Sequence, residues 1–220
     1  MNRSFRSRQF HIRTLEYPIK LLSPYLNPMR TLTSAPIILC CILGFVSWTA
    51  NAQKLVKIKV TESIVMSMPD VFRPMTDDEI ADRYFTTKRP MAMYTSMDRT
   101  VDLGINKSVT QWRESDLGIM KDFYKTNIFS LYDNVQMLNE GMEEINGRNY
   151  AYFEFVSTVK ADKNSIVNKK AITKYTYIQY TIVNGYSMVF NFTCPSIQRP
   201  TWSKKAKAMM QSVSIKKSLK

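Results

Sequence analysis

Many segments of the chain alternate apolar with polar side chains. A period of two residues is typical of a β-strand with one buried face, so we predict a strand at each of these segments. They are residues 54–60, 63–68, 91–96, 100–109, 135–138, 142–145, 150–158, 172–183 and 186–194. Most of the sheet is therefore expected from the second half of the chain.

Two Asn-Gly pairs, Asn146-Gly147 and Asn184-Gly185, separate neighbouring strands. Both central residues of a type I′ turn need positive φ, which Asn and Gly adopt more readily than other residues. Each pair therefore predicts a tight hairpin between antiparallel strands. The polar, basic segment 162–170 is expected to be an exposed loop.

Three segments carry the signals of helices. The first is expected to begin at Thr76, with Glu79 as the reciprocal partner of a capping box, and to end near Tyr84. The second opens at Ser115, and its predicted buried stripe is Leu117, Met120, Tyr124, Ile128 and Leu131, with Phe123 beside it. The third follows Pro200, and its predicted buried face is Trp202, Ala206, Met209, Met210 and Val213.

The order of these elements indicates the fold class. Antiparallel hairpins with two longer packed helices, and without strand–helix–strand alternation, are typical of α+β proteins. We therefore predict a mainly antiparallel sheet flanked by helices.

An uncharged, mostly apolar run at 35–48 precedes a motif of small residues. Ala50 and Ala52 fit the A-x-A rule of signal peptidase, with cleavage before Gln53. The run is shorter than the about 20 residues that a bilayer-spanning helix needs. We therefore predict a cleaved secretory signal over 1–52 and a single globular domain over 53–220, exported to the periplasm or beyond, with no stable membrane span after cleavage.

The amino-terminal region leaves alternatives open. Translation from Met29 instead of Met1 would give a charged segment of ordinary length before the apolar run. An uncleaved signal would act as an anchor. A lipoprotein would use Cys40 or Cys41, but a lipid-attachment box wants a small residue before the cysteine, where this chain has Leu39 and Cys40.

Composition is that of a globular protein and excludes several chemistries. The 220 residues are 45% hydrophobic and 12% aromatic, with one His and three Cys. Because His11 lies in the predicted signal, the mature domain would have no imidazole for a Ser-His-Asp or Cys-His mechanism or a His metal site. Cys194 would be the single mature cysteine, which excludes an intrachain disulfide, and we expect it to be a buried strand residue.

The chain is basic, with 31 Lys and Arg against 18 Asp and Glu and a formal net charge of +13. Removal of 1–52 leaves 25 bases and 17 acids. Many of the bases lie at Lys169, Lys170, Lys174, Lys204, Lys205, Lys207, Lys216, Lys217 and Lys220. They suit an anionic envelope polymer, lipid head groups or an acidic protein, although a solvated face is the simpler interpretation. Nucleic acid is not expected as the partner of an exported chain.

The acidic residues are interpreted as structural. Four of them, Asp77, Asp78, Glu79 and Asp82, lie at the start of the first predicted helix. Acids there complement the helix dipole, and no calcium-loop spacing accompanies them. Glu143 and Glu144 are adjacent on a predicted strand and so point to opposite faces, whereas paired acid–base catalysis needs them to converge.

Two Ser-x-x-Lys matches occur, at Ser157 with Lys160 and at Ser214 with Lys217. Residues three apart on an extended strand face opposite ways, whereas the catalytic dyad needs a helical turn to bring Lys against the hydroxyl. We therefore assign no catalytic, cofactor-binding or metal-binding residue from the sequence.

The order of elements resembles that of the PsbP-like superfamily, which includes the photosystem oxygen-evolving subunit and small exported bacterial domains of the DcrB type. The resemblance covers about 63–215. It rests on a strand ending in Met68-Pro69, a mid-chain helix, the strand and turn at 145–154, a hairpin, and a closing helix with Trp202, Ala206 and Ser212-Val213. It implies an α/β/α sandwich around an antiparallel sheet and a non-enzymatic binding or assembly module. No functional residue is carried over.

We expect an exported, non-enzymatic binding or assembly module of the cell envelope, without a cofactor, whose partner is an envelope protein or an anionic surface. One alternative is a hydrolase of envelope material that uses carboxylates alone. Another is a carrier of a small ligand, which a deep closed cavity between sheet and helix would favour.

Overall fold

A computed structural model of the chain describes residues 54–84, 88–160 and 171–216. These residues belong to one compact unit, 51–220. The predicted signal and its cleavage positions, Ala50, Ala52 and Gln53, lie outside the described residues and stay predictions.

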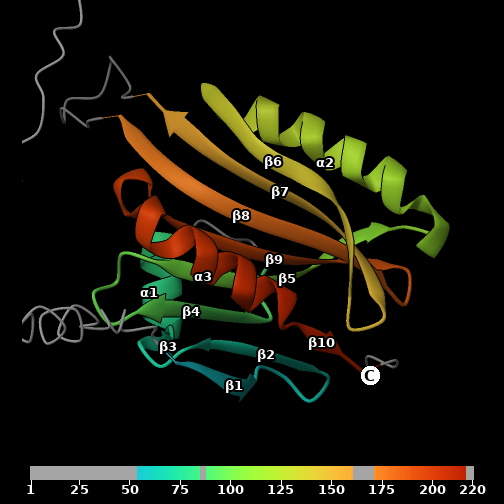
Figure 1. The fold of residues 1–220 in the computed structure, drawn as a ribbon, viewed down its shortest axis with the longest axis horizontal. Coiled ribbons are helices and arrows are strands. Elements are labelled where there is room, and N and C mark those ends of the chain that lie inside the picture. The colour runs from blue at the N-terminus through green and yellow to red at the C-terminus, as the bar shows by residue number, and fades with distance from the viewer. Residues whose placement is uncertain (1–53, 85–87, 161–170, 217–220) are drawn as a thin grey trace, which may run out of the picture. The chain divides into compact units, whose positions relative to one another are not determined.

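A seven-stranded sheet forms the centre of this unit, and every neighbouring pair in it is antiparallel. Its strands are β3 (Phe72–Pro74), β4 (Ala92–Ser96), β5 (Asp102–Gln111), β6 (Asn134–Ile145), β7 (Arg148–Val159), β8 (Ile172–Val183) and β9 (Tyr186–Pro195). They are ordered β3-β4-β5-β9-β8-β7-β6 (Figure 1). The two hairpins expected at the Asn-Gly pairs, β6–β7 and β8–β9, therefore lie side by side in the sheet.

A second, three-stranded sheet joins the two ends of the described chain. It consists of β1 (Leu55–Lys59), β2 (Ile64–Pro69) and β10 (Ser214–Ile215), with β2 in the middle. The backbone N–H of Ser67 also donates to the hydroxyl of Ser212, 2.7 Å away. The carboxyl-terminal segment thus completes the sheet that the first two strands begin.

Three α-helices among the described residues cover the large sheet on both faces. They are α1 (Asp77–Arg83), α2 (Leu117–Leu131) and α3 (Arg199–Gln211), with short 3-10 turns at η2 (Glu114–Asp116) and η3 (Ser196–Gln198). Figure 1 shows α3 in front of β8 and β9 and α1 behind β4. The small sheet packs on the same face as α3, and α1 and α2 lie on the other face. The predicted α+β class, an antiparallel sheet flanked by helices, is confirmed.

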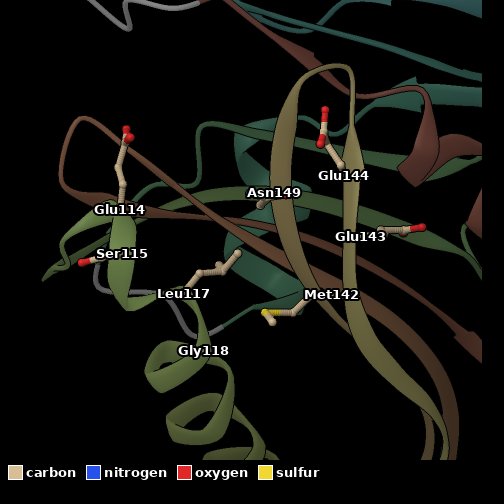
Figure 2. Close-up of a pocket in the computed structure, with 8 residues that line it drawn as sticks. All are labelled: Glu114, Ser115, Leu117, Gly118, Met142, Glu143, Glu144 and Asn149. Carbon is tan, nitrogen blue, oxygen red and sulfur yellow. The ribbon is translucent and has the colours of Figure 1, made fainter.

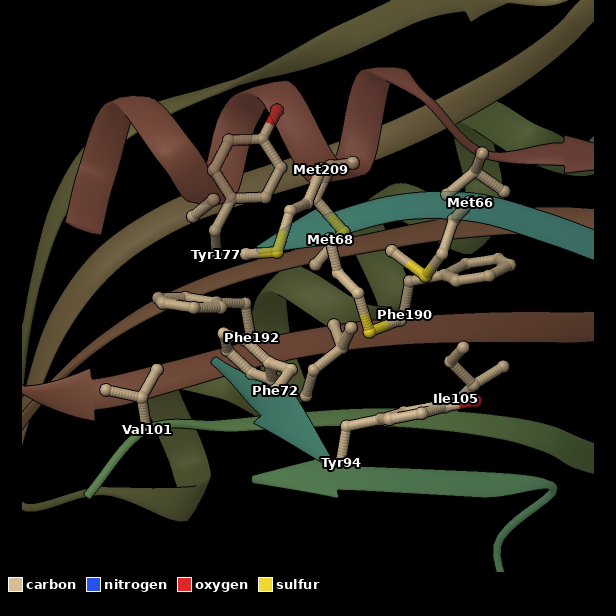
Figure 3. Packing of buried hydrophobic residues seen from close by; sticks show 14 of the residues in the cluster. Met66, Met68, Phe72, Tyr94, Val101, Ile105, Tyr177, Phe190, Phe192 and Met209 are labelled. Carbon is tan, nitrogen blue, oxygen red and sulfur yellow. The ribbon is translucent and has the colours of Figure 1, made fainter. Parts of the chain in front are cut away.

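The main hydrophobic core lies between the large sheet and the layer formed by α3 and the small sheet. Figure 3 shows Met209 of α3 and Met66 and Met68 of β2 packed over Phe190 and Phe192 of β9. Complete burial of one such side chain stabilises a fold by about 1.5–3 kcal/mol. The amphipathic face predicted for the last helix is therefore the face that α3 buries.

Both predicted Asn-Gly hairpin turns are confirmed. Asn146 and Gly147 have φ values of 49° and 76°, and Asn184 and Gly185 have values of 52° and 78°. Two successive residues with positive φ define the type I′ geometry that the right-handed twist of the flanking strands favours.

The structure differs from the sequence prediction in several elements. Residues 135–138 and 142–145 belong to one continuous strand, β6. The alternation of apolar and polar residues is interrupted between them, and a β-bulge between Met137 and Asn139 lets the strand continue its pairing with β7. The short strands β3 and β10 were not predicted, since segments of three and two residues carry too little periodicity. The turn η2 precedes α2, so the α-helix itself begins two residues after Ser115.

Leu131 does not belong to the buried stripe of α2, although Met120 and Ile128 do. Leu131 is 69% exposed. The helix ends at this residue, and the backbone of Tyr132 is extended, with φ −127° and ψ 149°. The ring of Tyr132 then packs on Phe155 of β7 and takes the contact that the helical period assigns to Leu131.

Candidate functional site

The side chains of Glu143 and Glu144 on β6 do not converge on one point. Glu143 accepts hydrogen bonds from Tyr177 and Gln211, both at 3.3 Å, on the side of α3. A hollow of about 370 Å³ beside the start of α2 is lined by Glu114, Glu143 and Glu144, among others. Figure 2 shows Glu143 pointing away from the other two carboxylates. The predicted opposite orientation of Glu143 and Glu144 is confirmed, so these two carboxylates do not form an acid–base pair.

The acids at the start of α1 hold the helix end in place. Thr76 and Glu79 form the predicted capping box, with hydrogen bonds of 3.2 and 3.1 Å. Both carboxylate oxygens of Glu79 also accept from Arg73 at 2.7 Å, and the Arg73 and Thr76 hydrogen bonds lower the pKa of Glu79 to about 2. Asp77 pairs with Arg89 at 2.7 Å. Within the described ranges, no group of three or more His, Cys, Asp or Glu side chains could hold a metal ion.

The nucleophile candidates are structural where the structure describes them. Cys194 is 1% exposed on β9, and burial raises the pKa of its thiol to about 12, which confirms the predicted buried strand residue. Ser157 is buried on β7, and Lys160 follows the end of that strand, where its backbone N–H donates to Asp133 at 2.8 Å. Lys217, in the second Ser-x-x-Lys match, lies outside the described residues.

Strand β9 carries polar side chains on the face that α1 and α2 share. Val189, Asn191 and Thr193 lie on this face, because they alternate with residues of the main core. Those core residues are Met188, Phe190, Phe192 and Cys194. Val189 packs in the cluster under α2. Asn191 and Thr193 continue along β9 beyond it.

Two adjoining hollows, of about 310 and 100 Å³, lie over Asn191 and Thr193, and both hollows are also lined by Tyr84. The larger one is completed by Tyr132, Ser157, Val159, Ile172, Lys174 and Thr176. The smaller one is completed by Ile80, Pro90, Met93, Asp102, Gly104 and Asn106. The two hollows together are termed the polar groove below.

Tyr84 lines both hollows and is fixed by a buried carboxylate. Asp102 on β5 accepts hydrogen bonds from the Tyr84 hydroxyl and from Arg83, both at 2.5 Å, and from Thr95 at 2.8 Å. Burial, and next the hydrogen bond to Asp102, raise the pKa of Tyr84 above its ordinary value. The Tyr84 hydroxyl is therefore protonated at neutral pH, and the charge of Asp102 is compensated by Arg83.

Tyr132 lines the side of the groove next to α2. Burial raises the pKa of Tyr132, and a hydrogen bond with Ser157 partly offsets the shift. The ring lies 6.0 Å from that of Phe155, measured between centroids. Two neutral phenol rings, Tyr84 and Tyr132, thus border a floor of hydroxyl and amide groups.

The side-chain oxygen of Asn191 is the unusual feature of the floor. Oδ1 is buried but accepts no hydrogen bond. A buried polar atom without a partner costs about 1–3 kcal/mol, and most such atoms in native proteins are paired. Asn191 itself lines both hollows, so rotation of its side-chain amide on ligand binding would bring this oxygen to a donor group of the bound molecule.

The side chains that line the groove are of the kinds that bind polar molecules through hydrogen bonds. Its floor presents the amide of Asn191 and the hydroxyls of Ser157, Thr176 and Thr193, and Lys174 stands exposed at its rim. The carboxylate of Asp102 is already engaged, and the two tyrosines keep their protons at neutral pH. The groups that line the groove can therefore hold a polar molecule by hydrogen bonds.

The groove is not evident from the sequence alone. A signal exists in β9, where polar side chains at 187, 191 and 193 alternate with an unbroken apolar series at 188, 190, 192 and 194. That alternation also describes any strand with a solvated face. The alternation indicates a binding site only when the positions of the helices beside this face of β9 are known.

The basic residues are on the surface where they are described. Lys174, Lys204, Lys207 and Lys216 are exposed, as a solvated face predicts, while Lys169, Lys170, Lys217 and Lys220 lie outside the described residues. Lys205 lies over the ring of Trp202, 4.9 Å from its centroid. In the part of the chain that the structure covers, no helix has both the length and the apolar character needed to cross a bilayer.

Comparisons with known proteins give matches in structure alone. No protein-family model matches the chain, and no curated protein has a matching sequence. A cyanobacterial PsbP (CyanoP) from Synechocystis sp. PCC 6803 has 12% identity and a TM-score of 0.47 over 76% of this chain and 96% of its own. PsbP is the superfamily that the sequence resembles.

Two further solved structures are similar at the same level. The Ran-binding protein Mog1p of Saccharomyces cerevisiae has 11% identity and a TM-score of 0.48 over 74% of this chain and 96% of its own. LpqN of Mycobacterium tuberculosis, involved in cell envelope biogenesis, has 11% identity and a TM-score of 0.42 over 74% of this chain and 90% of its own. The function proposed next therefore rests on this chain's own residues.

Proposed function

We propose that this chain is an exported binding module that holds a small hydroxyl- or amide-bearing ligand in the polar groove and does not transform it. The unpaired Oδ1 of Asn191 carries the proposal. The fold bears the cost of a buried acceptor at this position, and a ligand that donates to it recovers that cost. Export is supported by the apolar run at 35–48 and the small-residue motif after it.

The size and lining of the groove suit a small molecule. The larger hollow has a volume of about 310 Å³, close to the lower end of the about 300–1,000 Å³ typical of ligand pockets. Polar groups form its floor, and the rings of Tyr84 and Tyr132 border it. This combination offers directed hydrogen bonds beside flat apolar surfaces.

The same lining supports binding without catalysis. A general base must be able to lose and regain a proton near the working pH. The pKa values of Tyr84 and Tyr132 are both raised, and Asp102 is held by Arg83. These three ionisable groups are thus committed to the structure of the groove.

A titration of the full chain followed by amide NMR tests the proposal. The probes are N-acetylglucosamine, galactose and galacturonate, each up to millimolar concentration. We expect at least one probe to shift the resonances of Thr176, Asn191 and Thr193 in a saturable manner. Asn191→Leu should abolish the shifts, and the matched change Asn139→Leu, at an exposed position of β6, should leave them. Unchanged groove resonances with all three probes would contradict the proposal.

A further inference from the structure

We infer that the ligand of the polar groove is a sugar acid, a hydroxylated ring with one carboxylate, and that Lys174 binds the carboxylate. This inference rests on the proposed function and names its ligand class. It uses two observations in the larger hollow, the cation at the rim and the hydroxyl-rich floor.

Lys174 faces the groove from β8. It is paired in register with Ser157 on β7 and Pro195 on β9, and it lies two residues from Thr176 on the same face of the strand. Its side chain lines the hollow that contains Asn191. A carboxylate at Lys174 and a hydroxyl at Asn191 can therefore belong to one small molecule.

Lys174 has no carboxylate partner among the described residues. Asp102, in the adjoining hollow, is paired with Arg83. Asp133, next to Tyr132, accepts the backbone N–H of Lys160. Glu154 on β7 accepts from Tyr175, whose ring belongs to the core on the opposite face. An anionic group on the ligand would thus supply the counter-charge that the described residues do not provide.

The floor selects a hydroxylated anion over a simple one. The hydroxyls of Ser157, Thr176 and Thr193 can each donate or accept, and Asn191 Oδ1 requires a donor. An aliphatic carboxylate would satisfy Lys174 but leave Asn191 Oδ1 unpaired, which is costly when buried. A sugar acid offers both a carboxylate and O–H donors. The excess of 25 bases over 17 acids in 53–220 favours its approach.

Calorimetric titration of the full chain with galacturonate and with its methyl ester isolates the role of the charge, because the ester is neutral and keeps the ring hydroxyls. We expect galacturonate to bind about three- to fivefold more tightly than the ester, as for an ion pair that is partly exposed. Lys174→Met should remove this preference and Lys174→Arg should keep it. Lys204→Met, at an exposed position of α3, is the matched control and should change nothing.

The outcomes separate the two proposals. Equal affinity for acid and ester, or a preference that survives Lys174→Met, would overturn the sugar-acid inference and leave the binding function standing. No binding of either compound, together with unchanged groove resonances for N-acetylglucosamine and galactose, would overturn both. A galacturonate trimer distinguishes the source of the ligand, since tighter binding of the trimer points to a polymer and equal binding to the free acid.

Discussion

Replacing Asn191 by Leu should stabilise the protein, although it removes a polar side chain from a strand in the central sheet. The buried Oδ1 of Asn191 has no hydrogen-bond partner, and such an atom costs about 1–3 kcal/mol. Leu has a similar shape and buries no acceptor, but its new methyl groups partly face the groove. We therefore expect the free energy of unfolding to rise by about 1–2 kcal/mol. For a domain of this size, each kcal/mol corresponds to about 2–4 °C in Tm.

Urea and thermal unfolding of the full chain measure the effect. Asn191→Asp is the informative control, since it keeps the shape but places a charge at the buried oxygen, and it should destabilise the fold. The Leu variant should be more stable than the native chain but should not bind the ligand. This trade-off is expected where a side chain needed for binding lowers the stability of the fold. A Leu variant that is no more stable than the native chain would refute the reasoning, because it would show that the oxygen is already satisfied in solution.

Three further predictions concern residues outside the groove floor. Because the pKa of Glu79 is lowered to about 2, its ionised side chain contributes fully to stability above the ordinary pKa of 4.5. This contribution is lost as the pH falls from 4.5 towards about 2. Glu79→Gln should therefore flatten the pH dependence of the urea midpoint in that range. Met120→Ala, at a fully buried position of α2, should cost about 2–5 kcal/mol in urea unfolding, whereas Leu131→Ala, at a position 69% exposed, should cost less than about 0.5 kcal/mol. Cys194 should resist a thiol reagent in the native protein and react in urea, as peptide mass spectrometry can show, because its thiol is buried and its pKa is raised to about 12. Labelling of native Cys194 would contradict the placement of β9.

Most of the sheet could be predicted from the sequence because its strands are rich in β-branched and aromatic residues and are bounded by turn signals. Strand β8 has the bounds predicted from alternation, 172–183, and the two Asn-Gly turns have the φ values that their residue types favour. Helix α1 followed from its capping box, which is a local signal. Short strands such as β10 form through pairing with distant residues, and a local pattern carries no trace of that pairing.

The groove could not be predicted, because it depends on where the helices stop. Leu131 continues the apolar period of α2, and the sequence places it in the core. In the structure α2 ends there, and Tyr132 turns to the sheet instead. The part of β9 beyond this point, with Asn191 and Thr193, becomes the floor of the groove. The boundary between core and site is thus set by tertiary packing.

The pairing of β10 with β2 has a consequence for the order of folding. Ser214 and Ile215 pair with Val65 and Ile64, about 150 residues earlier in the chain, so the hairpin of β1 and β2 gains its third strand only after 214–215 have been made. Contacts between such distant residues form slowly, since a long loop must close first. The three-stranded sheet is therefore complete only after 214–215 have been made, and a copy that lacks these residues leaves β2, the middle strand of that sheet, with one unpaired edge.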